Sequence, residues 1–418
     1  MAEPPARAVP AGPAGLYAFP SDLADEGTGA VVRACMALGT DTLVLALAYH
    51  QARDVVPHAG DKPRLRYRKD GIFVRLTPAR WSGVRLQPTI GPPDDVAAVA
   101  ALLAADERPA VEAWTVFCHN TSLGEQHPEV ASLTCFGDRI LSNLCPAQPD
   151  VVAYARALAG EVSNLGLDVV AEALSAQTFG HGHHHERSFA PLDDLDQSLL
   201  SLCFCDRCAA RAAAAGADPE RLADAARRRV QRGFAGEPGG PASPDTLATA
   251  VGADVLSLLT ARAEAVTELA AAVADVVHGN GRRLSFMDLT GAVLGYDDGT
   301  PSGPLAADQA WRLGIEPTAV ARVVDSYTVL GYTRDPERLT ADVASVGTRL
   351  AGTALHAILR PGHPDTHSAD HLADKVRAAH EGGAARVDFY TYGMSDASVL
   401  ARIPGALGKS GLRHAPEE

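Results

Sequence analysis

The sequence predicts an α/β fold, a (β/α)8 TIM barrel with long loop insertions after strands 2, 3 and 4. Short apolar runs alternate with longer, alanine-rich amphipathic stretches along the chain, which is the pattern of repeated strand and helix units around a parallel sheet. Eight such units can be counted in the sequence. A doubly wound sheet is the competing architecture, but the usual nucleotide-binding signals, G-x-G-x-x-G after the first strand and G-x-x-x-x-G-K-S/T, are missing.

The strand candidates are short apolar segments, many of them rich in β-branched or aromatic residues. In chain order they are Leu16–Phe19, Thr42–Tyr49, Ala110–Cys118, Leu167–Glu172, Arg283–Asp288, Ser326–Tyr332, Leu355–Arg360 and Arg386–Tyr392. Helical periodicity separates them over Thr28–Leu38, Asp94–Ala105, Asp150–Leu165, Leu247–His278, Asp335–Leu350, Ser368–Glu381 and Ser398–Leu407. Glycines that follow several of these helices, such as Gly39 and Gly166, are typical of left-handed C-caps.

Three long excursions interrupt the regular spacing, over residues 51–92, 119–148 and 173–246. All three follow strand ends, where a barrel builds its pocket. The Gly- and Pro-rich stretch Gly233–Pro244 is interpreted as a mobile loop rather than a domain boundary. We therefore expect a disordered leader over residues 1–14, one barrel domain over residues 15–410 and a flexible tail over residues 411–418.

The composition limits the partners. A net charge of −14, a pI near 5.5 and the lack of a long basic block argue against nucleic acid or an anionic membrane surface. The start of the chain lacks the apolar core of a secretory signal, and no apolar run reaches the roughly 18 residues of a membrane-spanning helix. We expect a cytoplasmic protein that binds a small molecule and needs no organic cofactor. The sequence does not decide whether the protein self-associates through its outer helices, as large barrels often do.

Two carboxylates are the catalytic candidates. Glu172 directly follows a buried strand, so it would sit over the barrel mouth, where burial raises the pKa of a carboxyl group into the range of a general acid. Asp288 ends the next strand in the same way and would be its neighbour on the rim, so the two can form the pair that glycoside cleavage needs. The alternative for either residue is a capping or salt-bridging role.

Further polar residues at strand tips would converge on the same cavity as substrate-binding side chains. They are Asp22, His50, Arg53, His119, Asn120, Tyr332, Arg360 and Tyr390. The segment after strand four adds His181, His183, His184 and Glu186. Neutral imidazole serves both metal binding and proton transfer, but the spacing matches no H-E-x-x-H type of zinc site, which favours a hydrogen-bonded loop that lines a sugar pocket.

The triplet Cys203, Cys205 and Cys208 is the most specific metal signal in the chain. Seven cysteines in a chain of this length indicate reduced thiols rather than a disulfide framework. Three closely spaced thiolates need one more ligand to close a tetrahedral site, and a closed site is structural. We expect Cys145 to be the fourth ligand, with Cys135 as the second choice. The alternative is a set of free thiols at the start of a helix.

Together these features resemble the zinc-bearing bacterial β-galactosidases and related glycoside hydrolases of the (β/α)8 type. The resemblance rests on the strand-four Glu172, the C-x-C-x-x-C motif, and the segments His119-Asn120-Thr121 and Leu144-Cys145-Pro146. It implies that Glu172 is the general acid/base and that the cysteines hold a structural zinc. One departure is clear: the nucleophile of that family is a Glu at the end of strand seven, where this chain has Arg360.

The leading hypothesis is a glycoside-hydrolase-like enzyme that acts on a small sugar or glycosylated metabolite. Either another carboxylate such as Asp288 or Glu186 replaces the missing nucleophile, or the protein has left retaining hydrolysis. A sugar isomerase, epimerase or lyase of a biosynthetic pathway is the second hypothesis. A non-catalytic carbohydrate-binding barrel is the third; the tryptophans Trp81, Trp114 and Trp311 form no obvious stacking platform in the sequence, which disfavours it.

Overall fold

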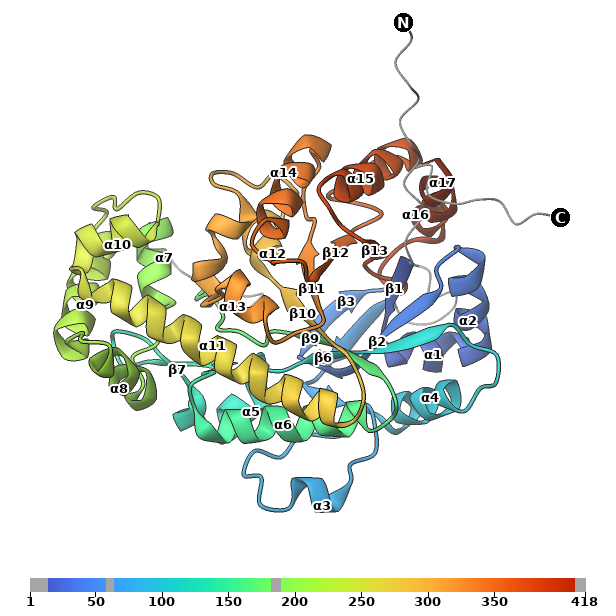
Figure 1. Cartoon of the computed structure of the whole chain (residues 1–418), viewed down its shortest axis with the longest axis horizontal. Helices are drawn as coiled ribbons and strands as arrows, with labels where there is room; N and C mark the ends of the chain where they lie inside the picture. The colour runs from blue at the N-terminus through green and yellow to red at the C-terminus, as the bar shows by residue number, and fades with distance from the viewer. Residues whose placement is uncertain (1–13, 58–63, 182–188, 410–418) are drawn as a thin grey trace, which may run out of the picture.

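The computed structural model describes residues 14–57, 64–181 and 189–409. At its centre, parallel strands form a closed barrel (Figure 1). The barrel strands are β1 (Ala14–Ala18), β2 (Thr42–Tyr49), β6 (Ala110–Val116), β9 (Asp168–Glu172), β10 (Leu284–Asp288), β11 (Ser326–Leu330), β12 (Ala354–Leu359) and β13 (Arg386–Phe389). Strand β1 pairs with both β2 and β13, which closes the sheet. The predicted (β/α)8 barrel is confirmed, and each predicted strand overlaps one of these.

Helices surround the barrel (Figure 1). The longer ones are α2 (Thr28–Ala37), α4 (Pro93–Leu103), α6 (Pro149–Ser163), α11 (Asp254–Gly279), α14 (Pro336–Gly347), α15 (Ala369–Glu381) and α17 (Arg402–Lys409). Shorter elements are α1 (Pro20–Glu26), α12 (Thr290–Gly295), α13 (Pro317–Ala321), α16 (Ala397–Leu400) and the 3-10 helices η2 (Ala306–Asp308) and η3 (Ala310–Leu313). The single helix predicted over Leu247–His278 is wrong, because Gly252 adopts a φ of 103° that separates α10 (Pro244–Val251) from α11.

Each of the three excursions contains secondary structure of its own. The first holds the hairpin β3 (Ala52–Val55) and β4 (Leu65–Arg68), then β5 (Gly71–Ile72) and α3 (Pro78–Trp81). The second holds α5 (Thr121–Gln126), η1 (Pro128–Val130) and the hairpin β7 (Ala131–Leu133) and β8 (Arg139–Leu144). The third contributes α7 (Asp194–Leu200), α8 (Asp206–Ala214), α9 (Pro219–Phe234) and α10, which gather at one side of the barrel in Figure 1 around a second apolar core.

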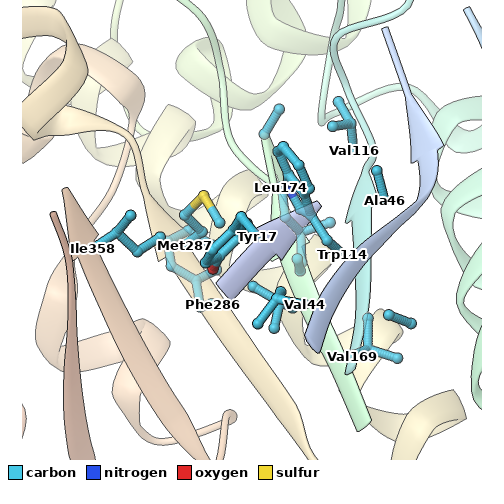
Figure 2. Close-up of a cluster of buried hydrophobic side chains, with 14 of the residues drawn as sticks. Tyr17, Val44, Ala46, Trp114, Val116, Val169, Leu174, Phe286, Met287 and Ile358 are labelled. Carbon is cyan, nitrogen blue, oxygen red and sulfur yellow. The ribbon is translucent and has the colours of Figure 1, made fainter. Parts of the chain in front are cut away.

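Aromatic and aliphatic side chains fill the barrel interior (Figure 2). Tyr17 of β1 and Trp114 of β6 meet edge to face, with their ring centroids 5.1 Å apart, and both are fully buried. Met287 of β10 and Ile358 of β12 lie near them in Figure 2. Successive strand residues point to opposite faces of the sheet, so this register decides which strand-tip side chains can reach the barrel mouth.

An ionic cluster ties three strands together inside the barrel. Arg386 of β13 donates hydrogen bonds to both carboxylate oxygens of Glu112 on β6, at 2.6 and 3.0 Å, and to Asp388 at 2.6 Å. The same Asp388 oxygen accepts the backbone N–H of Gly15 on β1 at 2.7 Å. A Cβ at position 15 would lie 2.5 Å from that oxygen, so the close approach requires glycine.

The predicted tail lies outside the described residues, as does the predicted leader except for Ala14, which begins β1. Among the helices of the described residues, none combines the length and apolar character that a membrane crossing requires.

The ionic cluster leads to a stability prediction. Replacing Arg386 with Met leaves Glu112 and Asp388 without their cation, so we expect the free energy of unfolding to fall by about 3–5 kcal/mol. The control is Arg283→Met, since Arg283 pairs with Asp168 at the surface, is 76% exposed, and should contribute less than about 1 kcal/mol. Urea denaturation of both variants measures the difference, and equal losses would show that the interior pairing is unimportant.

Candidate functional site

A cavity of about 670 Å³ opens at the carboxyl ends of the barrel strands. That volume is typical of small-molecule sites. Seven of the residues predicted from the sequence line it: His50, Arg53, His119, Glu172, His181, Tyr332 and Tyr390. Other lining residues include Tyr49, Asp54, Trp114, Asp194, Gln197, Ser198, Arg262, Tyr296, Trp311 and Arg312.

Glu172 is a buried acidic group in the lining of this cavity. It ends β9, is only 7% exposed, and accepts a hydrogen bond from the indole N–H of Trp114 at 2.5 Å. Burial raises the pKa of Glu172 to about 7, because the ionised form loses its hydration, and the Trp114 hydrogen bond offsets part of this effect. Its carboxyl group therefore carries a proton over much of the neutral range and can donate it.

An aromatic wall surrounds Glu172. The rings of Tyr49 and Trp114 lie 4.7 Å apart between centroids, and those of Trp114 and Tyr390 lie 5.8 Å apart. Tyr332 continues this wall beside Tyr390, at 6.5 Å, and Tyr296 lies 6.4 Å from Tyr332. The sequence analysis looked for a stacking platform among the tryptophans and so missed this one. The platform is built mainly from tyrosines, which come from distant parts of the sequence.

Three histidine side chains contact one another in another part of the cavity. The rings of His50 and His119 stack with centroids 4.0 Å apart, and Nε2 of His181 lies 3.2 Å from Nδ1 of His119. The ring of His50 also stacks on Tyr49. The predicted binding residues His183, His184 and Glu186 lie outside the described residues.

Asp288, predicted to be catalytic, does not line this cavity. Met287 projects into the cavity, and the next residue along β10 points to the opposite face. There Asp288 accepts hydrogen bonds from the Tyr327 hydroxyl at 2.7 Å and from the backbone N–H of Thr290 at 2.8 Å. It adjoins a crevice beside Leu339 of α14. Asp288 therefore ties β10 to β11 on the outer side of the barrel.

Three other residues predicted to bind substrate also serve the scaffold. Asp22 is fully buried, accepts the backbone N–H of Phe19 and pairs with Arg66 at 2.8 Å. Asn120 is the N-cap of α5 and accepts the backbone N–H of Leu123 at 2.9 Å. Arg360 makes a two-pronged ion pair with the buried Asp365, at 2.8 and 2.7 Å. None of the three lines the cavity.

Arg360 nevertheless supports the aromatic wall from behind. Its guanidinium lies 4.0 Å from the ring centroid of Tyr332. It also donates hydrogen bonds to the carbonyl oxygens of Gly295 and Tyr296, at 3.1 and 2.8 Å. The strand-seven side chain that does reach the cavity is Ile358, which is apolar.

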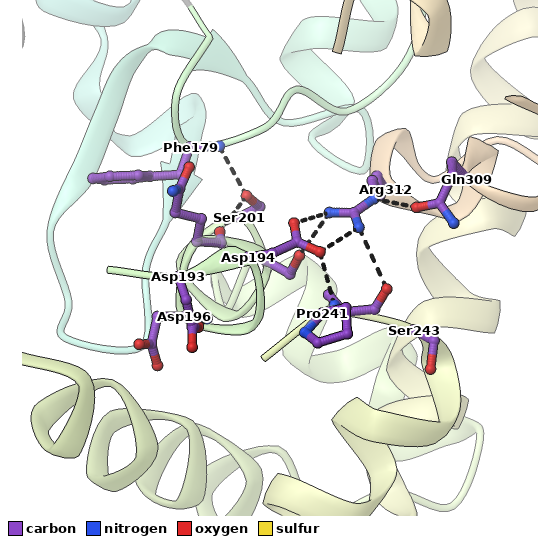
Figure 3. Close-up of polar contacts among 12 residues, drawn as sticks. Phe179, Asp193, Asp194, Asp196, Ser201, Pro241, Ser243, Gln309 and Arg312 are labelled. Atoms are coloured by element: carbon purple, nitrogen blue, oxygen red, sulfur yellow. Dashed lines mark hydrogen bonds and ion pairs between the residues drawn. The ribbon is translucent and has the colours of Figure 1, made fainter. Parts of the chain in front are cut away.

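One polar wall of the cavity, here called the far wall, combines residues of α7 in the third excursion with residues of η3, and Figure 3 shows the contacts between Asp194 and Arg312. Arg312 forms a fork with Asp194, with both N–O distances at 2.7 Å, and also donates to Ser198 at 3.1 Å. Asp194 in turn accepts the backbone N–H of Ala242 at 2.7 Å. The loop predicted to be mobile over Gly233–Pro244 is thus held against α7 through this residue. Sequence reasoning missed this wall, because its members become neighbours only in the fold.

Four buried cysteines meet beside this wall. The Sγ atom of Cys145 lies 3.7 Å from that of Cys205, 3.4 Å from that of Cys208 and 3.8 Å from that of Cys203. Tetrahedral thiolates about 2.3 Å from a metal ion are separated by about 3.8 Å, so the spacing fits a metal site. Cys135 is packed in a separate apolar cluster. Within the described part of the chain, this is the one group of three or more His, Cys, Asp or Glu side chains spaced to hold a metal ion.

Backbone and side-chain donors surround the cysteine cluster. The N–H of Leu133 donates to Sγ of Cys203 at 3.4 Å, and the side-chain amide of Gln148 donates to Sγ of Cys205 at 3.5 Å. Arg262, which is buried and lines the cavity, lies within electrostatic reach of the thiols and donates to the carbonyl oxygen of Arg312 at 2.9 Å. These contacts connect the metal-type cluster to the far wall of the cavity.

Comparison with solved structures identifies glycoside hydrolases of the same fold. The β-galactosidase from the psychrophilic Marinomonas ef1 superimposes with a TM-score of 0.55 and 11% sequence identity, over 96% of this chain and 61% of that protein. The β-galactosidase from Bacillus circulans sp. alkalophilus gives 0.54 and 11%, over 97% and 56%. The chain thus spans less than two thirds of the length of these enzymes. No protein-family model and no curated protein matches the sequence.

The comparison confirms the predicted resemblance at the level of the fold. The protein shares the (β/α)8 barrel of glycoside hydrolases, with sequence identities of about a tenth to the enzymes above. Sequence identity this low supports a shared fold and nothing further. The chemistry therefore has to be inferred from the residues that line the cavity.

The position of Asp288 gives a test of its role. Asp288→Ala leaves the buried Tyr327 hydroxyl and the Thr290 N–H without an acceptor, so we expect the free energy of unfolding to fall by about 1–3 kcal/mol. The matched control is Asp298→Ala, because Asp298 is exposed and accepts only local bonds from Thr300. Chemical denaturation measures both. Unchanged stability in Asp288→Ala would contradict a scaffold role.

Proposed function

We propose that the protein is a glycoside-hydrolase-like enzyme that acts on a small sugar or glycosylated metabolite, with Glu172 as its general acid/base. The observation that carries the proposal is the buried carboxyl group of Glu172 at the tip of strand four, inside an aromatic cavity where burial raises its pKa to about 7. A general acid for glycosidic cleavage needs a raised pKa and a place over the bond that breaks.

The lining of the cavity supports a sugar as the ligand. Sugar rings present apolar C–H faces that pack on aromatic side chains, and hydroxyl groups that need polar partners. The wall of Tyr49, Trp114 and Tyr390 supplies the first kind of contact. Gln197 and Ser198 on the far wall supply the second. The volume of about 670 Å³ favours a small molecule or a chain end over the interior of a polymer.

Strand seven distinguishes this site from retaining β-galactosidase chemistry. The resemblance places the nucleophile of that family at the end of strand seven, whereas here Ile358 faces the cavity and Arg360 is bound to Asp365. A second carboxylate for this chain therefore has to come from another element.

We also propose that the four-cysteine cluster holds a structural zinc ion. All four ligands are thiols, the arrangement closes the coordination shell, and Zn²⁺ prefers this set in structural sites. A closed shell leaves no position for substrate. The ion would hold β8 and the start of α8 together, and through them the far wall of the cavity.

The role of Glu172 predicts the loss of turnover in Glu172→Gln. On an aryl glycoside with a poor leaving group that the wild type cleaves, we expect kcat/KM to fall about 10²- to 10⁴-fold, because the proton donor is gone. The matched control is Glu161→Gln: Glu161 also accepts an indole N–H, from Trp81 at 2.9 Å, but does not line the cavity. Cleavage at the wild-type rate in Glu172→Gln would refute the proposal.

The raised pKa predicts a pH dependence that needs no substrate. Between about pH 4.5 and 7 the unfolded chain has lost the Glu172 proton while the folded protein keeps it, so this group makes stability fall as pH rises. The full effect is about 3 kcal/mol and is reached above pH 7. Urea denaturation at several pH values should show this slope in the wild type and a smaller one in Glu172→Gln. In the enzyme assay, kcat/KM should fall as pH rises through about 7.

The zinc proposal predicts that Cys205→Ser lowers both metal content and thermal stability, because an incomplete set of thiolates binds the ion weakly and the folded state loses the metal's binding energy. Cys135→Ser is the matched control, since it removes a buried cysteine outside the cluster and should retain the zinc. Elemental analysis of untagged protein gives the metal content. Retention of zinc in Cys205→Ser would show that the ion binds elsewhere.

A further inference from the structure

We propose that Asp54 is the second catalytic carboxylate, the base that activates water for an inverting displacement; this inference rests on the proposed function. Asp54 lies on β3, in the excursion after strand two, and lines the same cavity as Glu172. It is 6% exposed. The sequence analysis selected polar residues at the ends of the barrel strands. It did not select Asp54, because this residue lies in a hairpin outside those strands.

An ion pair fixes the position of Asp54. Nη2 of Arg68 on β4 donates to Oδ2 of Asp54 at 2.8 Å, and both side chains are buried. Arg68 is itself held over the Phe19 ring, 3.8 Å from its centroid. The other oxygen of Asp54 accepts no hydrogen bond from the described residues, so one oxygen is bound to the scaffold and one is left for a ligand or water.

The two carboxyl groups differ in their environments, as an acid and base pair must. Glu172 has no cationic partner among the described residues, and burial raises its pKa to about 7, whereas Asp54 is paired with the guanidinium of Arg68. In a glycosidase, the protonated group serves the leaving oxygen and the ionised group serves the attacking one.

The groups around the pair point to a wide separation. The hydroxyls of Tyr49 and Tyr390 lie 3.4 Å apart beside the cavity. Burial raises the pKa of Tyr390, and the charges of both Glu172 and Asp54 add to this shift, so both carboxylates act on the same phenol. The two carboxyl groups are also held by different side chains, since Trp114 binds Glu172 at 2.5 Å and Arg68 binds Asp54 at 2.8 Å. The Tyr49 ring is next to both of these partners, 4.7 Å from the Trp114 ring centroid and 5.7 Å from the Arg68 guanidinium. The proposal therefore places the two carboxyl groups apart across this ring, with room for the water molecule that inverting enzymes require.

The other acidic residues of the cavity fit this role less well. Both oxygens of Asp194 are bound to Arg312 at 2.7 Å, and one also accepts the Ala242 N–H. Asp297 is exposed, on the loop after α12. Neither has the single buried cationic partner that Asp54 has in Arg68.

The proposed reaction is hydrolysis of a glycosidic bond in a single displacement. Asp54 takes one proton from a water molecule as the water oxygen bonds to the anomeric carbon. The bond from that carbon to the glycosidic oxygen breaks, and Glu172 gives its proton to the departing oxygen. The products are a free sugar of inverted anomeric configuration and an alcohol, and the two carboxyl groups regain their starting protonation by exchange with solvent.

Glycosyl fluorides separate the two roles, because fluoride leaves without protonation. With the fluoride of the sugar that the wild type cleaves, we expect Glu172→Gln to retain activity within about tenfold, while Asp54→Asn loses about 10²-fold or more. The matched control is Asp25→Asn, because Asp25 pairs with Arg66 on the same hairpin at 2.7 Å but lies outside the cavity. Asp54→Asn keeps the shape of the side chain and an acceptor for Arg68, and thermal melting checks that it is folded.

The wild type supplies a second readout that needs no variant. Proton NMR of the first-formed product should show the anomer opposite to the substrate. Retention of configuration, or fluoride hydrolysis at the wild-type rate in Asp54→Asn while Glu172→Gln is impaired on aryl glycosides, would overturn the role of Asp54 and leave the proposed function standing. If the wild type cleaves neither a panel of aryl glycosides nor the fluorides, the proposed function fails first.

Discussion

The hydrogen bond from the Trp114 indole to Glu172 is the contact around which the cavity is arranged. Trp114 rises from β6 and is packed on Tyr17, Phe19 and Tyr49, with ring centroids 4.7–5.2 Å apart. This packing leaves the indole a single orientation, with its N–H directed at the tip of β9. The neighbouring rings exclude water from the carboxyl group, which is why the pKa of Glu172 is raised.

The far wall depends on the third excursion and on η3 rather than on the barrel strands. Residues there are held by charge pairs and backbone contacts, of which the fork between Arg312 and Asp194 is the best defined (Figure 3). Arg262 links the same wall to the cysteine cluster, because it donates to carbonyl oxygens of η3 and lies close to the thiols. The cysteine cluster, although it lies outside the cavity, can therefore shape the cavity without touching a ligand.

Strand seven shows how one barrel can be adapted to a different arrangement of charges. Arg360 occupies the strand tip but turns to Asp365, and its guanidinium lies against Tyr332. The position thus supports the aromatic wall instead of supplying a carboxylate. On the proposal made above, the negative charge comes instead from Asp54 on an added hairpin, which the barrel can acquire without changing its strands.

The sequence alone was sufficient for the eight strands, for Glu172 at a strand tip and for the three closely spaced cysteines, because periodicity and spacing are local properties. It could not tell Glu172 from Asp288, since both follow buried strands and only the register of the barrel turns one inward and the other outward. Nor could it place Asp54 in the cavity or bring Tyr49 to Tyr390, which are 341 residues apart. These contacts depend on closure of the sheet. Only the closed barrel brings strands from the two ends of the chain next to each other around one cavity.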